Sequence, residues 1–258
     1  MPVNSAGRRG SGSRRIPVRR TPEPAFEGDD AVIETDPTPY NPLDRLNLAR
    51  SIEATLLQQD CHRLPLASAF NGAGVYAIYY SGDFAAYRPI SSPECLIPIY
   101  VGKADPPGSR RGITDPGAAA GPALYGRIAD HTESIEAATN LRIEDFRVRF
   151  LVVGDIFIGL GEQLLIQQFR PLWNRHVAGF GLHDPGAGRH GSKRSEWDEL
   201  HPGRPWHPKM KQVTAAAELC TKIKAAFKSG EAATIEQMAS TSPPVESIDT
   251  PLPEAPET

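Results

Sequence analysis

The sequence predicts an α+β domain in which a small β-sheet is flanked by helices. Residues 74–80 and 97–103 are apolar runs rich in β-branched and aromatic side chains, as strands are. Polar and turn-forming residues separate the two runs, which predicts a long hairpin. Apolar and polar residues alternate over 146–153, which predicts a further strand with one polar face.

The remaining periodic stretches predict helices. The first begins near Asn41, which we expect to act as the N-cap, and its apolar stripe contains Leu43, Leu46, Ile52 and Leu56. Residues 104–121 form a loop dense in Pro and Gly, and residues 175–210 are irregular. The predicted helices are 42–59, 123–138, 158–170 (which Pro171 ends) and 214–228 (which Gly230 follows).

The two ends of the chain differ from its middle. Residues 1–38 are basic and rich in Pro, Gly and Ser, and residues 231–258 are acidic. Neither end has the apolar periodicity that would offset the entropy of ordering. The sequence therefore predicts one domain over 39–230 between two disordered tails.

The charge of the chain is segregated. The formal net charge is −3, yet the first twenty residues hold six Arg and no acidic residue. Residues 170–211 hold eight Lys or Arg, five His and four acidic residues. This local excess of positive charge predicts that a polyanion binds there, although such a basic loop can also be merely solvated.

Cysteine usage and hydropathy indicate a cytoplasmic protein. Cys61, Cys95 and Cys220 lie far apart in the sequence and form no C-x-x-C pair, so we expect reduced thiols. The N-terminal region has no apolar signal segment, and no apolar run is long enough to span a membrane.

Several polar residues stand at positions that call for an explanation. Arg127 and His131 are four residues apart and so share a helix face, which can be an exposed edge or part of a site. Glu162 precedes Leu165 and Phe169 at helical spacing and so lies beside the core-facing side. The alternative for Glu162 is an acid in the first helical turn, stabilised by the macrodipole.

Taken in order, these residues form a pattern. It consists of Gly74-Val75-Tyr76, Tyr100-Val101-Gly102, Arg127, His131, Glu162 and Asn174. This resembles the GIY-YIG nuclease superfamily, in which a small mixed sheet flanked by helices carries two tyrosines, an arginine, a metal-binding glutamate and a late asparagine. The departures, GVY for GIY and YVG for YIG, are conservative.

Within the superfamily the chain looks most like the type II restriction endonucleases that cut the palindrome CCGCGG. His131 stands one turn after Arg127, where many other members carry tyrosine. Residues 181–186 and 195–204 also resemble the C-terminal region of that branch. The likeness covers roughly residues 40–210.

The resemblance implies a one-metal phosphodiester hydrolysis. Glu162 would hold one Mg²⁺, which Mn²⁺ can replace, and Arg127 would bind the scissile phosphate. Tyr76 would be the general base, and Tyr100 and His131 would orient it or share its proton. The resemblance leaves open which of these three groups is the base. Lys103 would supply positive charge beside the tyrosines, and Asn174 would orient the site.

The resemblance also implies double-stranded DNA as substrate, a homodimer on a palindromic site and a cognate DNA methyltransferase in the same system. We expect guanines to be read from 175–211 and from the loop 104–112. A structure-specific repair nuclease or a non-catalytic DNA-binding module of the same fold remains the alternative. The candidate DNA-binding residues are Arg189, Lys193, Arg194, Arg110 and Arg111.

Overall fold

A computed structural model describes residues 39, 41–108 and 121–237 and confirms the α+β class. Arg110 and Arg111 lie outside these residues. The sheet has four strands in the order β1-β4-β2-β3, and all its neighbouring pairs are antiparallel. The strands are β1 (His62–Arg63), β2 (Gly74–Tyr80), β3 (Pro98–Ala104) and β4 (Phe146–Val152).

Strand β2 is the centre of the domain. It pairs with β3 in the predicted hairpin and with β4 on its other side, and all seven of its residues are buried. Val75, Ala77 and Tyr79 pack on one face of the sheet, and the alternate residues pack on the other face. A strand covered on both faces reads as a continuous apolar run, which is why 74–80 shows no alternation.

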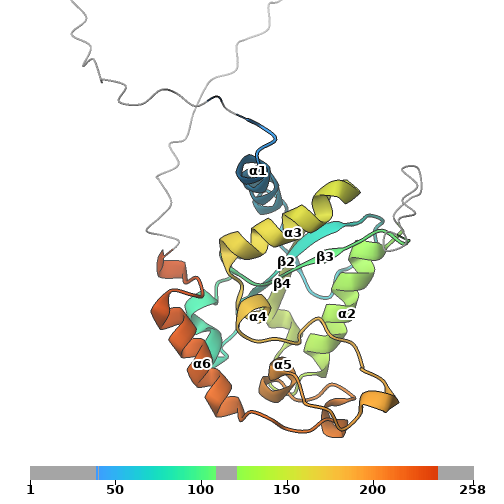
Figure 1. Cartoon of the computed structure of the whole chain (residues 1–258), viewed down its shortest axis with the longest axis vertical. Helices are drawn as coiled ribbons and strands as arrows, with labels where there is room; N and C mark the ends of the chain where they lie inside the picture. Colours follow the sequence, from blue (N-terminus) through green and yellow to red (C-terminus); the bar gives the residue numbers. More distant parts are fainter. Residues whose placement is uncertain (1–38, 40, 109–120, 238–258) are drawn as a thin grey trace, which may run out of the picture. The chain divides into compact units, whose positions relative to one another are not determined.

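Helices cover both faces of the sheet (Figure 1). On one face lie α1 (Arg45–Leu57) and α3 (Asp155–Phe169), which contribute Leu56, Leu165 and Phe169 to the core. The opposite face is covered by α2 (Ala123–Ala137), α4 (Leu172–Arg175), α5 (Glu196–Leu200) and α6 (Ala216–Ser229). Short 3-10 helices are η1 (Ala85–Ile90), η3 (Ile143–Asp145), η4 (Ala187–Arg189) and η5 (His207–Lys209).

Two predicted helix starts were wrong. The N-cap of α1 is Asp44, whose side chain accepts from the Leu46 N–H at 2.8 Å, whereas Asn41 caps the preceding turn. Leu43 and Leu46 are therefore exposed rather than packed, and the stripe is buried at Leu56. Helix α3 begins at Asp155, with Gly154 as its N-cap residue, rather than at Ile158 as predicted.

A disulfide joins Cys61 to Cys95, so the expectation of reduced thiols was wrong for this pair. The two residues are 34 positions apart, but the sheet brings their Cα atoms to 6.9 Å. Cys95 is buried in the core on the α1–α3 side of the sheet, against which Cys61 packs. Cys220 is free.

A chain of buried polar groups connects η1 to α5. The Trp173 indole N–H donates to the Tyr87 hydroxyl at 2.9 Å, and that hydroxyl lies 2.5 Å from His201 Nε2. His201 Nδ1 lies 2.9 Å from the side-chain oxygen of Asn140. Because each member has a partner, the network holds the C-terminal end of α5 against the core.

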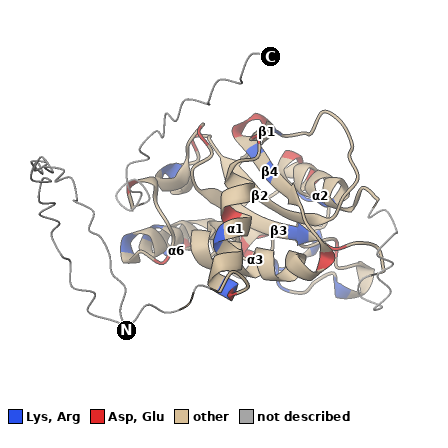
Figure 2. Ribbon diagram, turned by 90° about the horizontal axis from the view of Figure 1, so that it is seen from above, with Lys and Arg blue, Asp and Glu red and all other residues tan. Residues whose placement is uncertain are grey.

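The folded part of the chain extends past residue 230. Ala232 and Ala233, which were predicted to lie in the acidic tail, are buried in the main core cluster. Basic and acidic ribbon segments are interspersed over the elements (Figure 2). Within the described part of the chain, no helix is both long and apolar enough to cross a bilayer.

Candidate active site

Two tyrosines of the hairpin lie side by side on the α2 side of the sheet. Tyr76 is paired with Gly102 and Ile78 with Tyr100, so Tyr76 and Tyr100 are diagonal neighbours on adjacent strands. The ring centroids of Tyr76 and Tyr100 are 6.2 Å apart. A Cβ added at Gly102 would overlap the Tyr76 hydroxyl, so the tyrosine occupies the space that glycine leaves.

The Tyr76 hydroxyl lies 2.6 Å from His131 Nε2. His131 is 1% exposed, which rules out the exposed-edge alternative for this residue. Phe180 stacks on its imidazole with a centroid distance of 4.5 Å and an interplanar angle of 15°. The pair is thus enclosed between β2, α2 and the segment that carries Phe180.

Burial keeps both members of this pair neutral. It raises the pKa of Tyr76 well above its usual value, to which the neighbouring Tyr100 adds. Burial also lowers the pKa of His131 well below its usual value, and the positive charge of Arg127 adds to this effect. A neutral hydroxyl bonded to a neutral imidazole can pass a proton along the bond.

Arg127 lies one helical turn before His131 on α2. Its Nη1 is 3.0 Å from His183 Nε2, and its Nη2 donates to the Gly181 carbonyl at 3.1 Å. Sequence reasoning did not single out His183 or Gly181 as site residues, although both stand in the 181–186 segment that carries the family resemblance.

Glu162 lies about two turns inside α3, so it is not a first-turn acid. Its side chain is 27% exposed, and Lys103 Nζ is 4.0 Å from its Oε2. Burial raises the pKa of Glu162, while the charge of Lys103 lowers it in part and that of Asp105 raises it further. Lys103 is also 3.4 Å from Asp105, a second acid that sequence reasoning missed.

Glu162 has the character of a ligand for a hard cation. Its carboxylate is partly desolvated, and its ion pair with Lys103 is long. Across the described ranges, no group of three or more His, Cys, Asp or Glu side chains could hold a metal ion. Magnesium fits a single carboxylate, because it keeps several of its own waters and takes phosphate oxygens as further ligands.

Asn174 acts on the site through the backbone of β3. Its side-chain oxygen accepts from the Val101 N–H, and its side-chain nitrogen donates to the Val101 carbonyl, both at 2.8 Å. Val101 is between Tyr100 and Gly102, so Asn174 fixes the strand that carries Tyr100 and Lys103.

A groove of about 1030 Å³ is lined by several of the predicted catalytic residues. Tyr76 and His131 lie buried beside Tyr100, which is on the wall of the groove. An anion in this groove would meet the two cations Lys103 and Arg127 next to the Glu162 carboxylate. The groove is lined by Tyr100, Lys103, Asp105, Arg127, Glu162, Gly181 and His183, among others.

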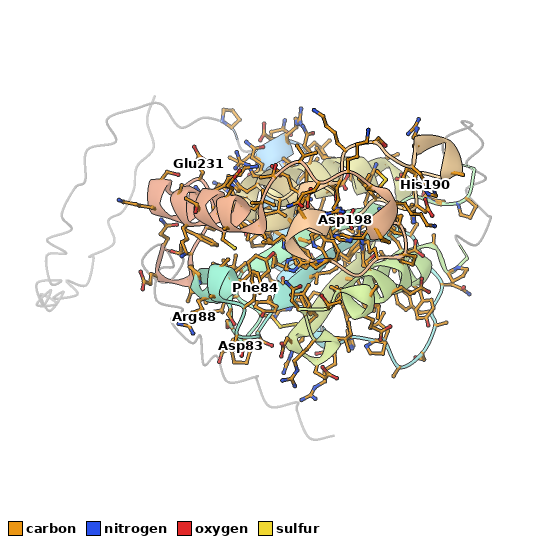
Figure 3. The ribbon with its side chains drawn as sticks, turned by 90° about the horizontal axis from the view of Figure 1, so that it is seen from below. Asp83, Phe84, Arg88, His190, Asp198 and Glu231 are labelled. Carbon is orange, nitrogen blue, oxygen red and sulfur yellow. A yellow bond between two sulfur atoms is a disulfide. The ribbon has the colours of Figure 1, made fainter. Side chains whose placement is uncertain are left out.

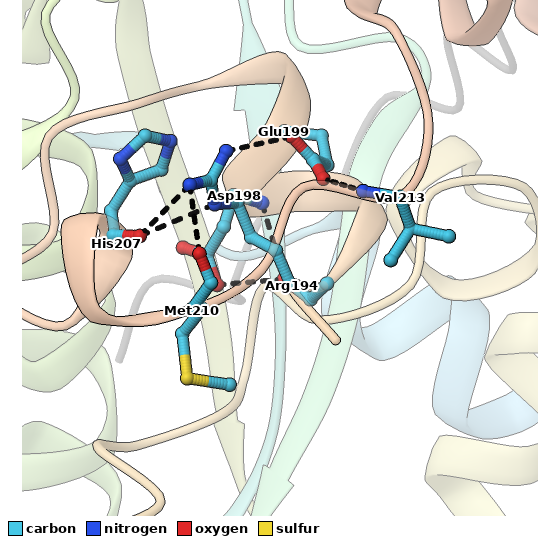
Figure 4. A network of polar contacts seen from close by, with 7 residues as sticks. Arg194, Asp198, Glu199, His207, Met210 and Val213 are labelled. Carbon is cyan, nitrogen blue, oxygen red and sulfur yellow. Dashed lines mark hydrogen bonds and ion pairs between the residues drawn. The ribbon is translucent and has the colours of Figure 1, made fainter. Parts of the chain in front are cut away.

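Arg194 is not a free donor, contrary to its prediction as a DNA-reading residue (Figure 4). Its Nη1 is 2.9 Å from Glu199, and its other nitrogens donate to the carbonyls of His207 and Met210. All of its guanidinium nitrogens are therefore used inside the protein. Arg189 and Lys193 are exposed.

The sequence of the chain matches a known protein family. A family model described as "Eco29kI GIY-YIG domain" matches residues 68–227, which include every residue of the predicted catalytic set. A comparison with curated proteins finds no match.

Proposed function

The chain belongs to the Eco29kI GIY-YIG family of restriction endonuclease domains, and we propose that it is a site-specific endonuclease that hydrolyses double-stranded DNA. The observation that supports this proposal is that Arg127, Lys103, Glu162 and Tyr100 line the same groove. Phosphodiester hydrolysis requires charge neutralisation, a proton acceptor for water and help for the leaving oxygen. The residues around the groove offer each of these.

We assign charge neutralisation to Arg127 and to the metal ion that Glu162 would hold. Arg127 binds the scissile phosphate through its planar fork of N–H donors. Magnesium, which manganese can replace, would be held by Glu162 and would stabilise charge on the phosphate and on the leaving oxygen. Lys103 lies within reach of Glu162 and adds positive charge at the same wall.

The proton path runs from the groove inward. Tyr100 lines the groove, whereas Tyr76 has no exposed surface. Burial raises the pKa of Tyr100, while the positive charge of Arg127 and a hydrogen bond to Tyr76 lower it in part. We therefore assign the contact with the attacking water to Tyr100 and the onward transfer to Tyr76 Oη and His131 Nε2.

The family supports further proposals about the DNA site. We propose a homodimer acting on a G/C-rich palindrome such as CCGCGG, with a methyltransferase that protects the same site. Arg189 and Lys193 remain available as base readers, together with Arg110 and Arg111 outside the described residues. Each good bidentate contact contributes about 1–3 kcal/mol of discrimination.

The experiment that tests the function compares the wild type with Glu162→Gln. Wild type with Mg²⁺ should cut plasmid DNA into discrete fragments, and Glu162→Gln should fold but not cut. Binding of the variant to DNA in Ca²⁺ should persist or tighten, because a negative charge near the phosphate is removed. Glu136→Gln, an exposed change on α2, is the matched control and should cut normally.

The same assay separates the alternatives. A folded Glu162→Gln variant that cuts at nearly the wild-type rate would contradict the assignment of Glu162 as the metal ligand. Nicking confined to branched substrates would indicate a repair nuclease, and tight binding without any cleavage would indicate a DNA-binding module.

A further inference from the structure

The guanidinium of Arg127 is held on one side by the segment 181–183. His183 Nε2 is 3.0 Å from Nη1, and the Gly181 carbonyl accepts from Nη2 at 3.1 Å. The carboxylate of Asp130 is 3.9 Å from Nη1, which is an ion pair without a hydrogen bond. Two contacts from one short segment therefore fix the orientation of the guanidinium plane.

The same guanidinium also makes hydrogen bonds to the hydroxyls of Tyr76 and Tyr100, so it lies between the segment 181–183 and the two tyrosines. A guanidinium carries five N–H donors in a fixed plane, and the two contacts use one N–H of each terminal nitrogen. Arg127, Gly181 and His183 all line the groove, so a ligand in the groove would meet the guanidinium in this orientation. A Cβ at Gly181 would lie 3.0 Å from Arg127 Nη2 and 3.1 Å from the Tyr100 hydroxyl, so a glycine permits this close approach.

The tautomer of His183 follows from its partner. Arginine only donates hydrogen bonds, so the imidazole nitrogen that faces it must carry a lone pair. His183 must therefore be neutral, with its proton on Nδ1, while it contacts Arg127. A protonated imidazole or the other tautomer would break the contact.

We propose that His183 is a positioning residue, which with the Gly181 carbonyl holds Arg127 in the orientation that receives the scissile phosphate. The proposal rests on the nuclease function proposed above. His183 touches no reacting atom in this role and acts through Arg127 alone. Because it orients a group rather than supplying one, its loss should lower kcat about 10- to 100-fold and change KM by less than about threefold.

The kinetic test uses His183→Ala, His183→Asn, His183→Gln and a matched histidine. His190 is the control, because it belongs to the same segment but pairs with Asp184 at 3.3 Å and does not line the groove. It lies beside η4, at the end of the molecule opposite Glu231 (Figure 3). The alanine variant should lose activity, and at least one amide variant should recover it, since an amide oxygen also accepts from arginine. His190→Ala should retain the wild-type kcat.

Three kinetic results would overturn the proposal. They are a normal or raised kcat in His183→Ala, an equal loss in His190→Ala, and failure of both amide variants to restore activity. A raised kcat would mean that the contact holds Arg127 away from the DNA.

A second measurement needs no substrate. Nitrogen NMR at pH 8 should show His183 protonated at Nδ1, with slow rotation of the Arg127 guanidinium that becomes fast in His183→Ala. An Nε2-protonated His183, or rotation unchanged by the substitution, would overturn the inference even in an active nuclease. A wild-type chain that cuts no DNA would overturn the nuclease function instead, and the NMR result would still decide whether His183 holds Arg127.

Discussion

Gly102 shapes the site by having no side chain. An alanine Cβ at this position would lie 2.5 Å from Tyr76 Cζ and 2.9 Å from Tyr100 Cε1. Both rings are held by close neighbours, because Tyr76 is fully buried against His131 and Tyr100 packs on Phe180 at 4.9 Å. The rings therefore have little freedom to move aside.

We predict that Gly102→Ala lowers the free energy of unfolding by about 1–3 kcal/mol and impairs cleavage, because overpacking displaces the two tyrosines. Urea unfolding and single-turnover cleavage measure the two effects. Gly126→Ala is the stability control: an added Cβ there meets no atom within 4 Å, and the position is inside α2. That change should stabilise by about 0.5–1 kcal/mol. Equal stabilities for the two variants would contradict the packing argument.

At the scale of elements, β3 is one of the two edge strands of the sheet and carries both Tyr100 and Lys103. Asn174 of α4 binds the N–H and the carbonyl of Val101 in the middle of this strand. The position of β3 thus depends on a side chain that is more than seventy residues away in the sequence.

We predict that Asn174→Ala costs about 1–3 kcal/mol of stability, because it leaves two backbone groups of Val101 unpaired. Cleavage should fall as well, since Tyr100 and Lys103 lose their support. Asn47→Ala is the control, because its amide on α1 donates to the Asn41 carbonyl ahead of that helix in an exposed hydrogen bond. Chemical denaturation and cleavage rates provide the readout, and a variant as stable and active as Asn47→Ala would refute the role.

The Cys61–Cys95 disulfide ties the segment after α1 to the loop that leads into β3. It closes a loop with a sequence separation of 34, so the chain-entropy model predicts a stabilisation of about 4 kcal/mol. Reducing agent should lower the urea midpoint of the wild type, and the double variant Cys61→Ala/Cys95→Ala should be insensitive to it. Cys220→Ser should behave as the wild type. Identical midpoints for oxidised and reduced wild type would exclude this contribution.

The sequence could predict the elements whose signal is local. The hairpin, α2 and α6 follow from runs and stripes that neighbouring residues carry, and the order of the site residues followed from family resemblance. The start of α3 could not be predicted from the apolar stripe, because Ile156 in its first turn is apolar yet 81% exposed. The disulfide, the bonds of Asn174 to Val101 and the internal role of Arg194 depend on residues brought together only by the fold.

For the molecule as a whole, buried histidines connect stability to pH. Burial lowers the pKa of His201 to about 3 and lowers that of His131 well below its usual value. Both are neutral in the folded protein, whereas in the unfolded chain a histidine takes up a proton near pH 6.5. The unfolded state therefore binds more protons as the pH falls, and stability is lost below about pH 6.5.

We predict that the free energy of unfolding falls by up to about 1.4 kcal/mol per histidine for each pH unit below 6.5. Glu162 has a raised pKa and so offsets part of this loss at lower pH. Urea unfolding at pH 7.5, 6.5 and 5.5 tests the slope, and His131→Gln should reduce it. A stability that is unchanged between pH 7.5 and 5.5 would rule out this linkage.

The bonds between Asn174 and Val101 also bear on how copies of this protein behave at high concentration. An edge strand offers unpaired N–H and carbonyl groups, which are a template for strands of other molecules and hence for aggregation. At Val101 both groups are already taken by an amide that mimics a neighbouring strand. The residue that orients the tyrosines therefore also blocks intermolecular strand addition at the centre of β3.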